Sequence, residues 1–250
     1  MEESVYEQFH NLEDSHFWFL GRRRIFLSLL EHFVVKNRTD LSILEIGCGP
    51  KGLLKYLASY GKVYGMDIAH QWLKICQDEG GQRLITGSGY ALPIKRESFD
   101  IIGLFDTLEH IPDDIQVLKE CRLAIKPGGY VFISVPAYQF LYSTNDRVSH
   151  HQRRYSRNEL KLKLREAGIE PVHLTYFNSL LFPIILPIVL GKKFVEKYFS
   201  KRGSQSTNLS HALPPLVNNA LTMIFSSESS LLKHVKFPFG HSLIAIGKKL

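Results

Sequence analysis

The sequence predicts an α/β fold built on an open, doubly wound, mostly parallel sheet. Short apolar runs alternate with amphipathic helical patterns over residues 41–135, as successive strand–helix–strand units require. The first apolar run, 41–46, leads directly into Gly47, Gly49 and Gly52, which are spaced G-x-G-x-x-G ahead of a helical pattern. Glycine permits a tight turn and lets a ligand touch bare backbone. The chain is therefore expected to form a nucleotide-sized pocket at the carboxyl edge of its parallel strands.

Hydrophobic periodicity predicts the individual elements. The expected strands cover residues 41–46, 63–66, 83–86, 99–104, 130–135, 171–176 and 242–246. The expected helices cover residues 1–36, a stretch through Ala58, about 70–77, 115–125, 156–167 and a patch around 216–225. Residues 126–129, Lys-Pro-Gly-Gly, are expected to be the turn that stops the helix before them. Ser156 and Glu159 have the spacing of a capping box at the start of the next helix.

Composition limits the partners and the compartment. The net charge of +7 favours an anionic partner, such as an acidic membrane surface, a phosphorylated substrate or nucleic acid, although it also fits a basic surface that only aids solubility. Cys48, Cys76 and Cys121 form no C-x-x-C pair, so a reducing compartment is expected rather than a disulfide framework or a zinc site. The first residues lack the apolar core of a secretory signal, and the cytoplasm is the expected location.

Two carboxylates near the glycines narrow the choice of nucleotide. Asp67 ends the second strand, where it can accept hydrogen bonds from the ribose hydroxyls of a dinucleotide or of S-adenosylmethionine. Glu45 stands two residues before Gly47, where it would repel a pyrophosphate but suits a ligand with cationic groups. S-adenosylmethionine is therefore the expected cofactor, and a nicotinamide-dependent oxidoreductase, NAD(P)-dependent, is the alternative.

Five motifs in register resemble the class I S-adenosylmethionine-dependent methyltransferases of the small-molecule type 11/12 kind. They are E-I-G-C-G-x-x-G from Glu45, M-D-I around Asp67, G-S-G-Y-A-L-P from 87 to 93, F-D-x-I…L-E-H-I ending at Ile111, and I-K-P-G-G at 125–129. The resemblance covers about residues 10–177 and the closing strand. It implies a seven-stranded Rossmann-like sheet in the order 3-2-1-4-5-7-6, with the last strand antiparallel.

The resemblance also implies roles for single residues. Gly47, Cys48 and Gly49 would border the methionine part of the cofactor, and Glu45 would order the loop and the amino end. Asp67 would hold the ribose, Ile68 would pack on the adenine, and Phe105 and Asp106 would lie along the sulfonium side. Ser88, next to Gly89, stands where many relatives have an Asp that contacts the adenine. That departure keeps open a catalytically silent methyltransferase fold that serves as a binding module.

The N-terminal segment His16–Arg23 resembles a helical lid of the same subgroup. In that role Trp18 would exclude water from the sulfonium and Arg22 would pair with the cofactor carboxylate. The alternative is that the aromatic residues only pack the helix against the core. The expected division is a lid at 1–36, a cofactor-binding domain at 37–177 and 241–250, and an insertion at 178–240.

Two histidines are candidates for the base that an acceptor hydroxyl would need. His151 lies after the fifth strand in an H-x-R-R-Y pattern that resembles the subgroup, and His110 follows the fourth strand. Alternatively, His151 pairs with Asp146, and the Arg-Arg-Tyr run at 153–155 either anchors the next helix or binds an anionic acceptor. No metal site is expected. The acceptor is expected to be a small or lipid-like molecule, not nucleic acid, because the Ser134–Tyr138 region departs from the N/D-P-P-Y/F motif.

The insertion combines an apolar run at 180–190 with a basic stretch that follows it. The run contains prolines and is too short to span a bilayer. It suits an interfacial membrane segment on the inner membrane face, a lid over an apolar acceptor, a homodimer interface, or a buried pair of helices.

Overall fold

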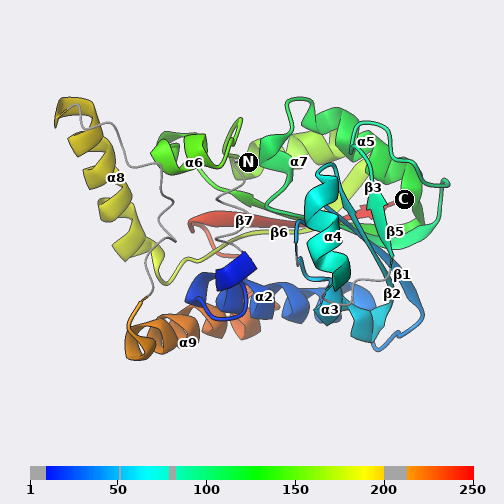
Figure 1. Ribbon diagram of the computed structural model, residues 1–250, viewed down its shortest axis with the longest axis horizontal. Helices are drawn as coiled ribbons and strands as arrows, with labels where there is room; N and C mark the ends of the chain where they lie inside the picture. Colours follow the sequence, from blue (N-terminus) through cyan, green and yellow to red (C-terminus); the bar gives the residue numbers. More distant parts are fainter. Residues whose placement is uncertain (1–9, 51, 79–82, 200–212) are drawn as a thin grey trace.

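The computed structural model describes residues 10–50, 52–78, 83–199 and 213–250, and its centre is a seven-stranded sheet (Figure 1). The strands are β1 (Leu41–Ile46), β2 (Gly61–Asp67), β3 (Leu84–Thr86), β4 (Phe99–Phe105), β5 (Ile125–Pro136), β6 (Ile169–Phe177) and β7 (Ser242–Lys249). Their order is β3-β2-β1-β4-β5-β7-β6, and only β7 runs antiparallel to its neighbours β5 and β6. The predicted fold class and strand order are confirmed.

Helices cover both faces of the sheet (Figure 1). They are α2 (Phe17–Leu30), α3 (Leu54–Leu57), α4 (His70–Asp78), α5 (Asp114–Ala124), α6 (Thr144–Val148), α7 (Arg157–Glu166), α8 (Phe182–Phe199) and α9 (Pro215–Leu231). Short 3-10 turns lie at Leu108–His110 (η3) and Gln139–Leu141 (η4). On one face, Val117 of α5 and Leu160 of α7 are fully buried against the sheet. On the other face, Phe26 of α2 and Phe225 of α9 are buried with Phe132 of β5.

Two local predictions concern the ends of helices. The capping box of α7 is confirmed, because Ser156 Oγ accepts from the Glu159 amide at 3.2 Å and Glu159 Oε2 accepts from the Ser156 amide at 3.4 Å. Helix α5 ends at Ala124, just before the predicted turn at 126–129. Strand β5 begins at Ile125, but its register with β4 then jumps: Ile125 pairs with Phe99 and Tyr130 with Ile101, so residues 126–129 bulge out of the ladder around Gly128, whose φ is +75°.

Helix α9, which lies within the predicted insertion at 178–240, packs against the core. It packs along α2, where Gly21 leaves room for Phe225: a Cβ added at Gly21 would lie 2.4 Å from Phe225 Cδ1. Polar contacts join the same two helices, since Asn218 Oδ1 accepts from the Phe17 amide at 2.8 Å and Arg24 donates to Ser226 Oγ at 3.2 Å. Residues 200–212 of the predicted insertion lie outside the described residues. No described helix is both long enough and apolar enough to cross a membrane.

Candidate active site

A cavity of about 360 Å³ opens at the carboxyl ends of β1, β2 and β4. This volume lies within the usual range of small-molecule sites, roughly 300–1,000 Å³. Every predicted cofactor residue except Trp18 lines it, namely Arg22, Glu45, Gly47, Cys48, Gly49, Asp67, Ile68, Ser88, Gly89, Phe105 and Asp106. The fold therefore brings together five segments that are separate in the sequence.

Glu45 shapes the glycine loop at the end of β1. Both of its carboxylate oxygens accept from the Leu53 amide, at 3.1 and 2.9 Å, and the side chain is buried. A Cβ at Gly52, whose φ is +55°, would lie 2.8 Å from Glu45 Oε1, so the third glycine of the motif makes room for this carboxylate. Burial raises the pKa of Glu45 to about 8. A cationic group placed beside it would favour the charged carboxylate again.

Asp67 connects the end of β2 to the same loop. Its Oδ2 accepts from the Gly49 amide at 2.9 Å and its Oδ1 from the Ala69 amide at 2.9 Å. A carboxylate has further lone pairs, which leaves acceptor capacity for two ribose hydroxyls. The next residue, Ile68, is 74% exposed although it lines the cavity, and Tyr90 lies across from the loops at 40% exposure. Exposed apolar side chains at a cavity mouth suit a flat, partly apolar ring such as adenine.

Helix α2 contributes a cation to the cavity. Arg22 forms an ion pair with Asp106, which follows β4 with a φ of +52°. Asp106 is held in place by Ser134 of β5, whose hydroxyl donates to Asp106 Oδ1 at 2.9 Å. Phe19, one turn before Arg22, also lines the cavity and lies 4.9 Å below the guanidinium. In this structure the lid cation therefore contacts a carboxylate of the protein.

Trp18 was predicted to contact the cofactor, but it is not among the residues that line the cavity. Its ring lies 5.5 Å from that of Phe225 and 5.8 Å from that of His241, outside the cavity lining. Trp18 packs there because α9 presents an apolar surface to it. The sequence around Trp18 does not show that surface, because α9 lies about 200 residues further along the chain. The helix-packing alternative therefore describes Trp18, whereas Phe19 and Arg22 carry the contact with the cavity.

The two predicted histidines lie side by side, but only His110 lines the cavity. The rings of His110 and His151 meet edge to face with their centroids 4.7 Å apart. Burial, with a smaller contribution from His151, lowers the pKa of His110 to about 3. A backbone hydrogen bond from the Gln152 amide to the Glu109 carbonyl, 2.7 Å long, holds the loop after β5 against η3.

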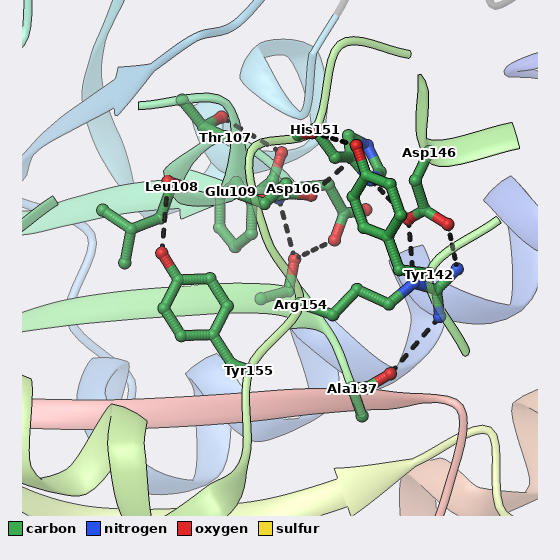
Figure 2. Close-up of polar contacts among 12 residues, drawn as sticks. Asp106, Thr107, Leu108, Glu109, Ala137, Tyr142, Asp146, His151, Arg154 and Tyr155 are labelled. Atoms are coloured by element: carbon green, nitrogen blue, oxygen red, sulfur yellow. Dashed lines mark hydrogen bonds and ion pairs between the residues drawn. The ribbon is translucent and has the colours of Figure 1, made fainter. Parts of the chain in front are cut away.

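Asp146 and Arg154 hold His151 from behind (Figure 2). His151 Nδ1 lies 2.8 Å from Asp146 Oδ1, and the Arg154 guanidinium donates to both oxygens of Asp146 at 2.8 and 3.0 Å. Burial would raise the pKa of Asp146, but the hydrogen bonds from His151 and Arg154 outweigh it and hold the pKa below its ordinary value. The carboxylate thus keeps its charge and directs the other ring nitrogen, Nε2, toward Glu109.

The Arg-Arg-Tyr run has a supporting role. Arg153 pairs with Asp114 at 3.0 Å, and the Tyr155 hydroxyl donates to the same carboxylate at 2.7 Å. Arg154 is 5% exposed and engaged with Asp146. The anchoring alternative therefore describes these residues better than an anion site, because their donors are already used inside the protein.

Glu109 was not predicted from the sequence to be a site residue. Glu109 is fully buried, and neither carboxylate oxygen has a hydrogen-bond partner among the described residues. Burial raises its pKa well above the ordinary value. The absence of a metal-ligand cluster was also expected, yet donor atoms of Glu109, His110 and His151 lie within 4.8 Å of one another, a set that could hold an ion. The sequence could not show this, because His151 reaches the other two only through the fold of the loop after β5.

The comparisons with known proteins agree with this geometry. A family model described as a methyltransferase domain matches residues 44–133. The chain is 30% identical to the ubiquinone biosynthesis O-methyltransferase of Idiomarina loihiensis over 187 residues, which are 65% of this chain and 75% of the relative. It is 28% identical to the protein of the same name from Bordetella avium over 52% of this chain, and there it spans only 62% of the relative's length.

Solved structures share the fold. A chain in the complex between the Haloferax volcanii Trm112 methyltransferase activator and a methyltransferase aligns with a TM-score of 0.63 at 14% identity, covering 99% of this chain and 95% of that one. An S-adenosylmethionine-dependent methyltransferase of Thermotoga maritima aligns with a TM-score of 0.57 at 22% identity over 99% of both chains. The methyl donor of this family is S-adenosylmethionine, and the carboxylates and glycines of the cavity fit it. The chain belongs to the class I S-adenosylmethionine-dependent methyltransferases.

Proposed function

We propose that this methyltransferase methylates a hydroxyl group of a small, partly apolar or lipid-like acceptor. The observation that carries the proposal is the group of Glu109, His110 and His151 beside the cavity, whose donor atoms lie within 4.8 Å of one another. One oxygen atom placed among them would be within hydrogen-bond reach of all three. The names of the relatives, O-methyltransferases that serve ubiquinone biosynthesis, agree with a hydroxyl acceptor.

The cavity residues would hold the cofactor as the resemblance implies. Glu45 is suited to the amino end, Asp67 to the ribose hydroxyls and Ile68 to the adenine, while Arg22 is suited to the cofactor carboxylate. Gly47, Cys48 and Gly49 would border the methionine part, and Ser88 with Gly89 would border the adenine. Bound S-adenosylmethionine supplies an electrophilic methyl group that is already activated for in-line displacement.

The protein's own contribution is to place the acceptor and to remove its proton. The acceptor oxygen would take the methyl group as the methyl–sulfur bond of the sulfonium breaks and its electron pair stays on sulfur. The acceptor O–H bond would break in the same step, and Nε2 of His151 would take the proton. Asp146, bonded to Nδ1 at 2.8 Å, stabilises the resulting imidazolium. His110, which remains neutral because burial lowers its pKa to about 3, positions the hydroxyl from the cavity side.

An apolar acceptor is concentrated in a bilayer, so we propose that the protein works at the inner membrane surface while its other substrate comes from the cytoplasm. The three cysteines are buried and form no disulfide with one another, which agrees with a reducing compartment. An aromatic group beside the acceptor loop supports an apolar acceptor: Tyr138 stacks on Tyr176 at 5.1 Å and lies 5.8 Å from Phe182 of α8.

The test is transfer of a labelled methyl group from S-adenosylmethionine to a short-chain prenylated catechol, compared with matched acceptors that carry an amine or no ionisable hydrogen. Transfer to the catechol oxygen alone is expected. Transfer only to the amine would contradict the hydroxyl proposal. Calorimetry separates the alternative functions, because a dinucleotide enzyme would bind NAD(P) and a silent binding module would bind S-adenosylmethionine without turnover.

Chelation separates the base from an ion in the same place. If His151 acts as the base, activity should survive exhaustive dialysis against a chelator. Loss of activity that a divalent cation restores would instead assign Glu109, His110 and His151 to a metal site.

A further inference from the structure

Helix α8 has one inward and one outward face, and the outward face is apolar. Phe182 and Val189 are buried against Leu141 of η4. The side chains that point away are exposed although they are apolar, with Ile184 and Phe194 each 60% exposed and Ile188 54% exposed. Pro183, Pro187, Leu190 and Val195 are exposed beside them. Single exposed apolar residues are ordinary, whereas a continuous apolar stripe on a helix marks a contact surface.

Helix α9 presents a second stripe of the same kind. Thr222, Phe225 and Ser226 face the core, whereas Leu216 is 84% exposed and Met223 71% exposed. The remaining exposed apolar residues of this helix are Val217, Ala220, Ile224 and Leu231. We call the exposed apolar residues of α8 and α9 together the apolar face. In Figure 1, α8 projects from the body of the molecule at the end where α9 begins.

The acidic residues of both helices are engaged in contacts within the protein. Glu196, the acid of α8, accepts from Thr144 Oγ1 at 2.6 Å. Glu228, the acid of α9, is fully buried and accepts from the backbone amides of residues 178–180 at 2.7–2.8 Å. Lysines flank the stripes, with Lys192 exposed on α8 and Lys236 exposed after α9. Within the described residues, the exposed side chains of the two helices therefore include apolar and cationic residues, whereas Glu228 is buried and Glu196, whose side chain is 31% exposed, contacts Thr144 and Arg147.

We propose that the apolar face docks the protein onto an anionic lipid bilayer. Amphipathic helices that lie in the headgroup layer combine an apolar face with flanking cations, which is the arrangement of α8 and α9. A bilayer fits better than a second copy of this chain, because the net charge of +7 makes two copies repel each other, whereas it attracts the protein to anionic headgroups.

The apolar face is also tied to the proposed acceptor loop. Glu196 contacts Thr144 of α6, and Lys193 Nζ donates to the Phe140 carbonyl at 2.6 Å. Both partners lie in the loop after β5 that carries Asp146 and His151. The purpose of docking rests on the proposed function: it would bring this loop to the membrane layer in which a lipid-like acceptor resides.

The experiment is co-sedimentation of the full chain with phosphatidylcholine vesicles that contain about 30% phosphatidylglycerol, compared with phosphatidylcholine alone. The wild type should bind the anionic vesicles and should lose most of that binding in high salt. The double variants Ile184→Glu/Ile188→Glu and Leu216→Glu/Met223→Glu should each bind at least about tenfold more weakly. Leu162→Glu, at a site on α7 that is 67% exposed, is the matched control and should bind as the wild type does.

Calorimetry with S-adenosylmethionine on the same samples reports whether each variant is folded and whether the cofactor site is intact. Undiminished vesicle binding by both double variants, or no binding by the wild type, would overturn the docking proposal. A wild-type dimer that the same variants convert to a monomer, without vesicle binding, would assign the apolar face to a second copy. Vesicle binding without methyl transfer would refute the proposed function and leave docking intact.

Discussion

Arg22 of the lid helix forms an ion pair with Asp106 at the end of β4, so the lid is tied to the sheet across the cofactor cavity. Ser134 donates to Asp106 at 2.9 Å and holds this carboxylate in place. An arginine recognises a carboxylate well through its planar set of donors. Under the proposed function, Arg22 would be a cation already positioned at the cavity for the cofactor carboxylate.

Replacing Arg22 should weaken cofactor binding. We expect Arg22→Gln to lower the affinity for S-adenosylmethionine about tenfold, because one charge-assisted hydrogen bond contributes about 1.5–3 kcal/mol and Asp106 then loses its partner as well. Calorimetry is the measurement. Arg24→Gln is the control, since Arg24 lies on the same helix but contacts Ser226. Equal losses in both variants would show that the effect arises from the helix and not from the cavity.

Glu45 should make stability depend on pH. Its pKa is raised from 4.5 to about 8, so between these values the folded state holds a proton that the unfolded state has released. The free energy of unfolding contributed by Glu45 is therefore fully present below about pH 4.5 and is lost as pH rises toward 8, by up to about 1.4 kcal/mol per unit.

Glu45→Gln should remove this dependence. Relative to the wild type, the variant should become more stable as pH rises from about 5 to 8, while its affinity for S-adenosylmethionine falls because the cationic ligand has lost its carboxylate. Urea denaturation at several pH values checks the first expectation and calorimetry the second. A stability difference that does not change with pH would contradict the raised pKa.

His151→Ala should lower kcat about 100-fold or more, because the proposed base is lost. The Kd for S-adenosylmethionine should stay nearly unchanged, because His151 is not among the residues that line the cavity. Single-turnover kinetics with a saturating cofactor would measure the chemical step. His150→Ala, the neighbouring histidine, is the matched control. Turnover equal to that of the wild type would rule out His151 as the base.

Phe225→Ala should destabilise the protein by about 3–5 kcal/mol, because the ring is fully buried between α2 and the sheet. Met223→Ala, two residues earlier and 71% exposed, should change stability by less than about 0.5 kcal/mol. Urea denaturation followed by circular dichroism measures both. Similar small effects would place α9 outside the cooperative core.

Sequence patterns predicted the elements correctly where the stabilising contacts are between residues close together in the chain. The apolar run 41–46 became β1 because its side chains are buried on both faces of the sheet, and Ser156 capped α7 through contacts three residues away. The start of β5 at Ile125, before the turn at 126–129, was harder to predict, because the pairing of Ile125 with Phe99 depends on a neighbouring strand. Trp18 was assigned to the cavity for the same reason, since its partner Phe225 is distant in sequence.

The amino-acid sequence was enough to establish the doubly wound sheet, the glycine loop and its two carboxylates, because alternation of apolar residues and backbone demands at glycine act over a few positions. Tertiary structure alone decided that Glu109, His110 and His151 meet, that Arg22 reaches Asp106, and that α8 and α9 expose their apolar sides. These relationships depend on which loops and helices pack together, and that packing reflects the shape and burial of residues far apart in the chain.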